Sequence, residues 1–461
     1  MSAHAHHRNG SKLAHRVDKL FDLAELVHRK LTVAKHDSPG VAIIRELLQV
    51  VYATTLKTEE SETLRFSIAY VDPAHPDPDP PLRHVADHWR CVGLTSRIPF
   101  DPRNLAKLSK GADPATTMLA VHRDGNGELF IWGLIDQVAV HALRFLTWET
   151  DHGPGTPGSF YITANGVADV TVGRDYGILG LLKQEQIVEK FDNVFREGPV
   201  RELLGKSLEA SLKAIQAVHP GVSKSEVKKW LLPDRVTTIS RILLQMQSYK
   251  HGGALLITPE LTDDLNLKYD LPYDRLPHAL ICHTREGIRA ENARHEIYEH
   301  MIPAGEAIPI DSFKEYAQAE NNWREGLAEL AACVRFVASL SRLDGLVLMR
   351  PDLSVVGFGV EILGPDEIND LYIAEDECGT RLRQATSNHY GTRHRSMMRY
   401  CNAHRDALGF VVSQDAFIRG IRRVGNKLLM WENIQVRNEF DPDSSAEQIC
   451  PHCENFAGHS H

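Results

Sequence analysis

The sequence lacks long hydrophobic runs, an apolar leader and an excess of positive charge. Its apolar runs, such as Ala254–Ile257, are far shorter than the roughly 20 residues that a membrane helix needs. The first segment, MSAHAHHRNGSK, is polar and has no signal-peptide core, so we expect a cytoplasmic protein with no membrane partner. The 61 acidic residues against 52 basic ones give a net charge of −9. This balance argues against nucleic acid as a partner, because backbone binding needs a concentrated basic face.

Cysteine is scarce, with 7 residues in 461. Five of them are scattered along the chain, which is typical of reduced cytosolic thiols and not of a disulfide framework; they are Cys91, Cys282, Cys333, Cys378 and Cys401. The other two form Cys450-Pro-His-Cys453, and His459 and His461 follow. Two thiols and two imidazoles could complete a tetrahedral zinc site, but a frayed, His-rich tail is the simpler interpretation.

The length of 461 residues predicts two or three domains. We interpret residues 1–196 as an α+β domain, because two amphipathic helical segments precede a strand at Leu64–Val71 and two β-hairpin patterns. The hairpins turn at Asp124-Gly125 and at Asn165-Gly166. Residues 197–234 read as a helical connector, with a helix over Arg201–Val218 that ends at His219-Pro-Gly. Residues 441–461 form the His- and Cys-rich tail.

The remaining segment, residues 235–440, alternates helical patterns with short buried strands. A helix with Val236, Ile239 and Leu243 on one face precedes the strand Ala254–Ile257, and a long helix is predicted over Phe313–Leu340. Three more apolar runs follow, at Leu346–Met349, Val355–Val360 and Leu408–Val412. This order predicts an α/β domain in which helices flank a mixed sheet.

Three polar clusters in this segment point to a site for an anionic ligand. The first is Asp344-Gly345-Leu346, where a carboxylate stands beside a glycine that lets a ligand approach the backbone. The second is Gly391-Thr-Arg-His-Arg395, which we call the basic motif, followed by Ser396; its arginines offer bidentate donors to phosphate oxygens. The third is Val411-Val-Ser-Gln-Asp415, a strand that ends in polar side chains, and ligand sites of α/β sheets form at such ends.

Together these clusters resemble the diadenylate cyclase family, which pairs a DGA motif with GTRHR and a strand ending in SEE or SQE. This chain has DGL, GTRHR and VSQD in the same order. The resemblance extends to Gly253–Ile257 and to Val356–Ile362, and it covers about Arg235 to Asn433 with an insertion near Cys282–Ile308. The N-terminal half more loosely resembles the DACNV sensor-like domains that stand ahead of such cyclases, for instance at Ile131-Trp-Gly-Leu-Ile135.

The resemblance implies a diadenylate cyclase that condenses two ATP molecules into cyclic di-AMP and two pyrophosphates. The active sites of two subunits would meet face to face in a homo-oligomer. Asp344, with Asp415 as a second contact, would bind Mg²⁺ or Mn²⁺, and Arg393, His394 and Arg395 would act on the phosphates. The implied ATP contacts are Gly345, Leu346, Ile362, Gly391, Thr392, Ser396, Ser413 and Gln414.

The chain departs from the family at two points. Leu346 stands where the family has a small alanine, which predicts a tighter pocket, and Gln414-Asp415 replaces the usual glutamates and shortens the reach of the metal ligand. The alternative is therefore an inactive, nucleotide-binding sensor with the same fold; a zinc-dependent interaction protein built on the tail is a third interpretation. A second basic segment, Gly379-Thr-Arg-Leu-Arg383, lacks the histidine. We call it the look-alike segment and assign the site to the basic motif.

Overall fold

The computed structural model describes residues 3–434 apart from 34–38, 60–61, 77–89, 114–115, 137–158, 175–176, 184–185, 189–192, 250, 303–306, 365–367, 369 and 414–416. The chain divides into two compact units, and the border lies between Phe191 and Asp192. Each unit is mixed α/β and is described by itself. None of the helices in the described ranges is both long enough and apolar enough to cross a membrane.

The first unit is an eight-stranded sheet in the order β10-β9-β8-β7-β3-β5-β6-β4. Only β3 and β5 pair in parallel among its described strands. The strands are β3 (Phe66–Tyr70), β4 (Arg90–Pro99), β5 (Thr117–Arg123), β6 (Leu129–Asp136), β7 (Phe160–Gly166), β8 (Asp169–Arg174), β9 (Gly177–Lys183) and β10 (Gln186–Val188). A separate two-stranded ribbon joins β1 (Thr58–Glu59) and β2 (Glu62–Thr63).

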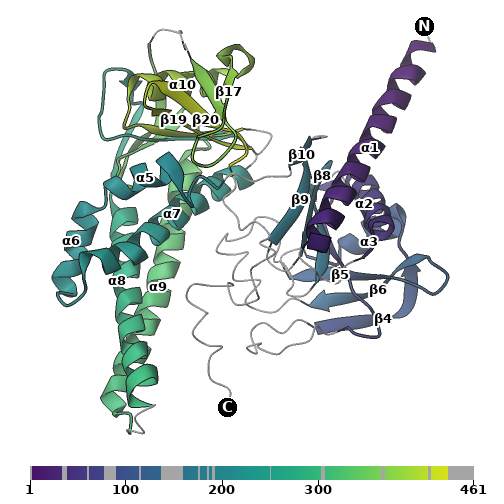
Figure 1. Cartoon of the computed structure of the whole chain (residues 1–461), viewed down its shortest axis with the longest axis horizontal. Helices are drawn as coiled ribbons and strands as arrows, with labels where there is room; N and C mark the ends of the chain where they lie inside the picture. Colours follow the sequence, from purple (N-terminus) through teal and green to yellow (C-terminus); the bar gives the residue numbers. More distant parts are fainter. Residues whose placement is uncertain are drawn as a thin grey trace. The chain divides into compact units, whose positions relative to one another are not determined.

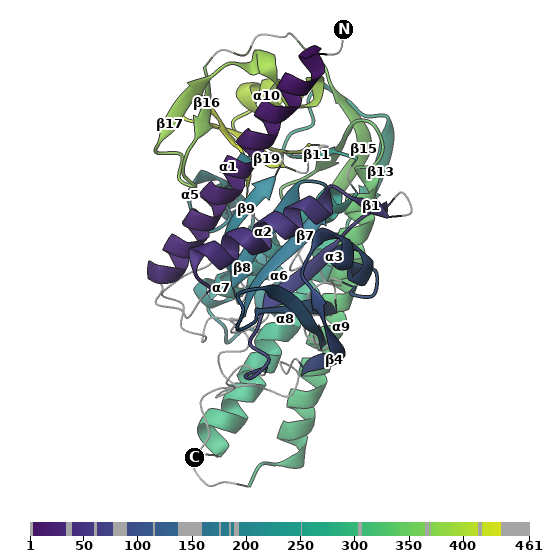
Figure 2. The same cartoon turned by 90° about the vertical axis from the view of Figure 1, so that its right-hand side faces the viewer.

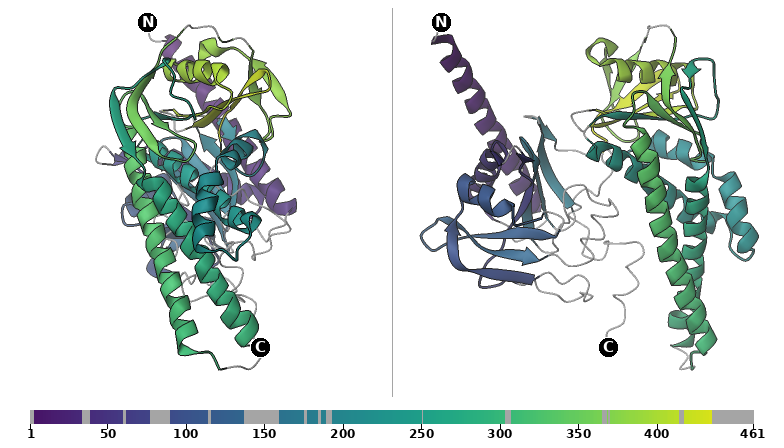
Figure 3. Two further views of the ribbon diagram at one scale, coloured as in Figure 1. Left: turned by 90° about the vertical axis from the view of Figure 1, so that its left-hand side faces the viewer. Right: turned by 180° about the vertical axis from the view of Figure 1, so that it is seen from behind.

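Three helices cover one face of this sheet: α1 (Ala3–Val33), α2 (Val41–Thr55) and α3 (Pro102–Ser109). Leu23, Leu47 and Leu105 from the three helices join one apolar core with alternate residues of the strands, as the period of two along a strand requires. Figure 2 shows α2 lying across β7 and β8, and the right view of Figure 3 shows the purple helices against this sheet.

Both predicted hairpins form, as β5–β6 and β7–β8, but the second turns at Val167-Ala168 and not at Asn165-Gly166, which belongs to β7. The first turn closes because the Asp124 carboxylate accepts hydrogen bonds from the amides of Asn126 and Glu128, at 2.9 Å each. Gly127 follows with φ of +88°, a conformation that glycine adopts without strain.

The second unit holds a ten-stranded mixed sheet in the order β12-β15-β14-β11-β18-β19-β20-β16-β17, with β13 also paired to β15. The β11–β14 and β16–β20 pairs are parallel and the others antiparallel. The strands are β11 (Gly253–Ile257), β12 (Leu265–Asn266), β13 (Tyr269–Tyr273), β14 (Leu346–Met349), β15 (Val355–Ile362), β16 (Leu371–Ala374), β17 (Leu382–Ala385), β18 (Leu408–Val412), β19 (Ile418–Val424) and β20 (Lys427–Trp431).

Helix α10 (Thr392–Ala403) packs on one face of this sheet (Figure 1). It buries Met397 and Met398 against Ile421 and other strand residues. The approach to β18 is close: a Cβ on Gly409 would lie 2.3 Å from Sδ of Met397, so a larger residue there would have to displace the Met397 side chain. A short 3₁₀ turn, η3 (Ser387–His389), precedes α10.

The other face of the sheet receives helix α5 (Gly198–Lys206). Arg422, next to the α10-facing Ile421, must point to the opposite side because strand residues alternate, and its guanidinium donates to the Pro199 carbonyl of α5. The C-terminal end of α5 is held as well, since the buried Arg235 of α7 (Lys224–Ser248) donates to the Ser207 carbonyl at 3.3 Å.

The single helix expected over Arg201–Val218 is wrong, because the chain forms α5 and then α6 (Glu209–Val218). Ser207 leaves the helical conformation, with ψ of 30°, and its carbonyl bonds Arg235 in place of a helical amide. The periodicity of apolar residues continues across the break, so the sequence did not reveal it. These helices, which cover the predicted connector, belong to the second unit.

Two long antiparallel helices extend away from the sheet, α8 (Arg275–His295) with the π-helical turn η2 (Glu296–Met301), and α9 (Ile310–Leu340). Figure 1 and the left view of Figure 3 show them side by side. His283 stacks on Trp323 between them, with ring centroids 5.8 Å apart. The segment near Cys282–Ile308, where an insertion is expected, includes most of α8 and the turn η2 and ends before α9 begins.

Candidate functional site

The register of the sheet brings two of the polar clusters to one edge, and the contact of His394 with Arg419, at the start of β19, brings the basic motif to the same edge. Asp344 lies two residues before Leu346, the first residue of β14. Strand β15 runs antiparallel to β14, so its last residue, Ile362, lies at the same end. The N-terminal end of β11 lies beside that of β14 and pairs with the C-terminal end of β18, through Gly253 and Val412. Ser413 therefore emerges at the same edge, two strands from Asp344, at a strand spacing of about 4.8 Å.

Asp344 is exposed, and the backbone of the next residue, Gly345, lies close to that of β15. Gly345 has φ of +111°, and a Cβ there would lie 2.5 Å from the carbonyl carbon of Gly359, which itself has φ of +64°. Gly345 is therefore required by the close approach of the β14 and β15 backbones, and Gly359 by its positive φ. The contact fixes the start of β14, and with it the position from which Asp344 projects.

Leu346 lies in the hydrophobic core, with 5% of its surface exposed. It pairs across the sheet with Val360 and joins the cluster beneath α10 that includes Met397. The core accommodates the three extra carbons that distinguish leucine from alanine. The half-buried Ile362 borders the same cluster.

A lysine that the sequence patterns did not single out lies near Asp344. Lys268 forms an ion pair with Glu361 at 2.5 Å, and Asn266 also donates to that carboxylate, at 3.3 Å. The hydrogen bond with Glu361 raises the pKa of Lys268, with a smaller contribution from the charge of Asp344. A cation and two carboxylates therefore stand together where β14 and β15 meet.

The basic motif forms the N-terminus of α10. Gly391 is the N-cap and offers no side-chain acceptor to the first amides of the helix, so their partial positive charge stays uncompensated. The first turn adds Arg393 and Arg395 and contains no acidic residue. Among the residues that the structure describes, no carboxylate pairs with either arginine. Such an assembly of amides and guanidinium groups favours an anion.

His394 is held by an arginine from the neighbouring strand β19. Arg419 Nη1 lies 3.1 Å from His394 Nε2, and because a guanidinium only donates, Nε2 must be the acceptor. Burial and, after it, the charges of Arg419 and Arg393 lower the pKa of His394 to about 4. The imidazole is therefore neutral at pH 7. Sequence patterns missed Arg419; its place at the start of the strand after Ser413 was the available signal.

The two serines of the predicted site are partly engaged within the protein. The Ser413 hydroxyl accepts from the Phe417 amide at 3.2 Å and lies 3.3 Å from the Phe417 carbonyl, which closes the turn between β18 and β19. Ser396 Oγ accepts from Arg399 Nη2 at 2.9 Å. Thr392 is exposed at the first position of α10. Gln414 and Asp415 lie outside the described residues, as does the tail with Cys450 and Cys453.

The look-alike segment is neutralised by its own surroundings. Asp376 accepts from the amide and hydroxyl of Thr380, at 2.8 and 2.6 Å, and from the amide and Nε of Arg381, at 2.9 and 3.3 Å. Arg383 lies 3.6 Å from Glu375 and 3.7 Å from Glu432. These arginines already have carboxylate partners, so they offer little to a phosphate.

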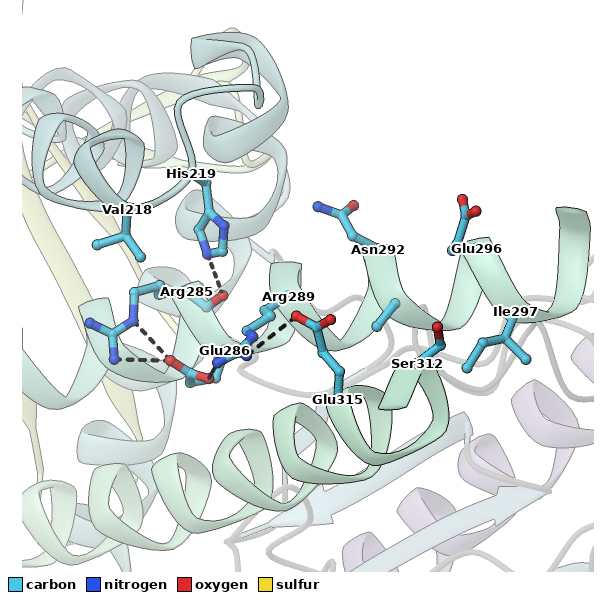
Figure 4. A pocket seen from close by; sticks show the side chains of 11 residues that line it. Val218, His219, Arg285, Glu286, Arg289, Asn292, Glu296, Ile297, Ser312 and Glu315 are labelled. Atoms are coloured by element: carbon cyan, nitrogen blue, oxygen red, sulfur yellow. Dashed lines mark hydrogen bonds and ion pairs between the residues drawn. The ribbon is translucent and has the colours of Figure 1, made fainter. Parts of the chain in front are cut away.

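A cavity of about 660 Å³ lies elsewhere in this unit, between the end of α6 and the helical pair (Figure 4). Its charged groups pair with one another: Glu286 accepts from Arg285 at 2.9 Å, and Arg289 lies 3.3 Å from Glu315. His219 contacts a backbone carbonyl, that of Arg285, at 3.2 Å. With both of its arginines already paired to carboxylates, this cavity is a weaker candidate for an anion than the sheet edge.

Divalent metal ions fit the sheet edge only in part. Within the described ranges, no group of three His, Cys, Asp or Glu side chains is arranged to hold a metal. Mg²⁺, however, is commonly bound by one or two carboxylates together with substrate phosphates. The exposed Asp344 beside an anion site matches that donor set.

Comparison with protein families finds a similarity in the first unit. Residues 34–136 match a family described as "probable sensor domain DACNV". The match runs from α2 to β6 and includes Ile131–Ile135, so the expected sensor-like character of the N-terminal region is supported. No curated protein matches the chain.

Proposed function

We propose that the second unit is a diadenylate cyclase, which condenses two ATP molecules into cyclic di-AMP, and that the first unit regulates it. The supporting observation is the basic motif at the start of α10, whose arginines lack carboxylate partners in the described chain, at the sheet edge that carries Asp344. The order of the DGL, GTRHR and VSQD motifs supports the same reaction. So does the similarity to DACNV, because such domains stand ahead of cyclases of this family.

The proposed reaction joins the nucleotides of two subunits. Each ribose 3′-oxygen forms a bond to the α-phosphorus of the opposing ATP, the bond from that phosphorus to the bridging oxygen breaks, and pyrophosphate leaves with its electron pair. The 3′-hydroxyl proton passes to the Asp344 carboxylate or to water. Arg393 and Arg395 hold the phosphates and offset the negative charge that develops. Mg²⁺ or Mn²⁺ held by Asp344 would supply Lewis-acid activation of the 3′-hydroxyl.

The direct test is incubation of the full-length protein with ATP and Mn²⁺ or Mg²⁺, followed by mass spectrometry for cyclic di-AMP. Turnover in Asp344→Asn should fall by about 10²-fold or more, because the amide keeps the size but loses the charge. ATP affinity should change less. Normal product formation by this variant would place the chemistry elsewhere. Activity per subunit should rise with protein concentration, since one subunit cannot present both nucleotides.

The second candidate function is a nucleotide sensor without catalysis. It is favoured by Ser413, whose hydroxyl closes its own turn, because fewer donors then remain for a reacting phosphate. The same incubation separates the two functions. Clear binding of ATP without any cyclic di-AMP, in either metal and at high protein concentration, would establish the sensor.

A further inference from the structure

Strand β19 presents two arginines to the two ends of α10. Arg419, Ile421 and Arg423 alternate with residues of the opposite face, and Ile421 packs in the core beneath α10. Arg419 reaches the first turn of the helix through His394. Arg423 Nη1 instead donates to the Asn402 carbonyl near the C-terminus, at 2.7 Å. A cation at the C-terminal end of a helix is favourable, whereas one at the N-terminal end is not.

Arg419 therefore occupies an electrostatically unfavourable position. It adds a positive charge to a helix end that already carries Arg393, Arg395 and uncompensated amides. The rings of Tyr390 and Phe417 lie 5.9 and 6.0 Å from its guanidinium carbon, and cation–π contacts at such distances offset only part of the repulsion. Its Nε is buried and has no hydrogen-bond partner in the part of the chain that the structure describes. An anion at this end would relieve the repulsion.

We propose that Arg419 is a positioning residue for the proposed cyclase: it fixes His394 as the neutral Nδ1–H tautomer, so that the imidazole donates a hydrogen bond to an ATP phosphate. This inference rests on the proposed function. With Nε2 occupied by the guanidinium, the ring proton resides on Nδ1. A neutral ring in this tautomer presents a donor to the phosphate without having to lose or gain a proton during turnover.

The groups around His394 set the direction of its titration. Arg419 faces it from β19 and Arg393 from α10, and both disfavour protonation. Tyr390 lies beside the ring, with centroids 5.8 Å apart, and its hydroxyl donates to Glu432 at 2.8 Å, which engages that carboxylate. Removal of Arg419 should therefore raise the pKa of His394 from about 4 toward its ordinary value of roughly 6.5.

The test is ¹⁵N NMR of the His394 side chain in the full-length protein, across a pH titration. In Arg419→Ala we expect the pKa of His394 to rise and both neutral tautomers to be populated. The matched control is Arg423→Ala, a change on the same strand and face that should leave the His394 signals in place. Arg419→Lys, which keeps a donor and a charge, should restore the tautomer in part and guards against a folding defect. An unchanged pKa and tautomer in Arg419→Ala would overturn the proposal.

Kinetics give the second readout. In Arg419→Ala, kcat for cyclic di-AMP should fall at least about tenfold, with a smaller change in KM for ATP. The loss should shrink as the pH falls toward the raised pKa of His394, because a protonated ring again donates through Nδ1 in every molecule; a loss that deepens as the pH falls would overturn the positioning role. Should the natural protein prove inactive, the cyclase proposal fails on its own. The NMR titration, repeated with pyrophosphate as the anion, would still confirm or reject the Arg419–His394 assignment.

Discussion

Two five-residue segments of this chain, Gly379–Arg383 and Gly391–Arg395, are identical except at the fourth position, where one has leucine and the other histidine. The look-alike segment turns into the strand β17, whereas the basic motif begins the helix α10. In the first, carboxylates surround the arginines. In the second, the guanidinium of another arginine, Arg419, contacts His394.

The comparison teaches that neighbours decide what such a segment can bind. Asp376, three residues before the look-alike segment, accepts hydrogen bonds from two of the residues that could hold a phosphate, Thr380 and Arg381. The basic motif is followed by Met397 and Met398, which are buried under the helix and thereby anchor its N-terminus at the sheet edge. Two guanidinium groups form an anion site only where no carboxylate has already taken them.

The largest expected effect separates the two segments directly. Arg393→Ala should weaken ATP binding by on the order of 1.5–3 kcal/mol, the contribution of a charged phosphate contact, or about 10- to 150-fold in Kd. Arg381→Ala should leave the affinity nearly unchanged, since that guanidinium serves Asp376 and the Glu375 carbonyl. Isothermal titration calorimetry with ATP and Mg²⁺ measures both. Equal losses in the two variants would remove the distinction between the segments.

Sequence reasoning could find the basic motif but not the environment of either segment. The GTRHR pattern and the buried strands around it are local features, and β11, β14, β15 and β18 follow from them, whereas the helix α10 was not predicted. Lys268 meets the site because its segment pairs with the distant strand β15, and Arg419 because β19 packs against α10; no local pattern encodes either contact. The tighter pocket predicted from Leu346 shows the same limit of sequence reasoning. Whether Leu346 faces a pocket or the core depends on its packing against Val360 and Met397, which are not its neighbours in sequence.

A smaller effect concerns the stability that the look-alike segment provides. Burial alone would raise the pKa of Asp376, but hydrogen bonds from Thr380 and Arg381 outweigh it and lower the pKa to about 2. Because the folded pKa is below the unfolded one, this stabilisation is present above about pH 4 and is lost as the pH falls toward 2. Asp376→Asn should cost about 1–2 kcal/mol at neutral pH.

Urea unfolding between pH 7 and pH 3 measures this effect. The difference in the free energy of unfolding between the natural protein and Asp376→Asn should shrink as the pH falls. Asp72→Asn is the control, because within the described residues that carboxylate accepts a single hydrogen bond, from the Ala74 amide at 2.9 Å. A difference that stays constant with pH would mean that the charge of Asp376 contributes nothing to stability.

The smallest expected effect is the most informative about sequence motifs. Leu382→His turns the look-alike segment into a second GTRHR, identical in sequence to the basic motif. It should not create a nucleotide site. Arg381 and Arg383 keep their carboxylates, and residue 382 stays paired with Ala374 in a strand, so no helix N-terminus supplies free amides. We expect ATP affinity to change by less than about threefold, or roughly 0.7 kcal/mol.

The background for this substitution should be Arg393→Ala, in which the native site is weakened and any new one is visible. If Arg393→Ala with Leu382→His recovers the ATP affinity of the natural protein, five residues are enough to make the site and the surrounding charges are secondary. If affinity stays low there, and returns on reverting residue 393 to arginine alone, the position at the start of α10 is what gives the motif its function. Adding Asp376→Asn to the same protein then tests the remaining step: release of Arg381 from its carboxylate should still give no site, because the helix end is missing.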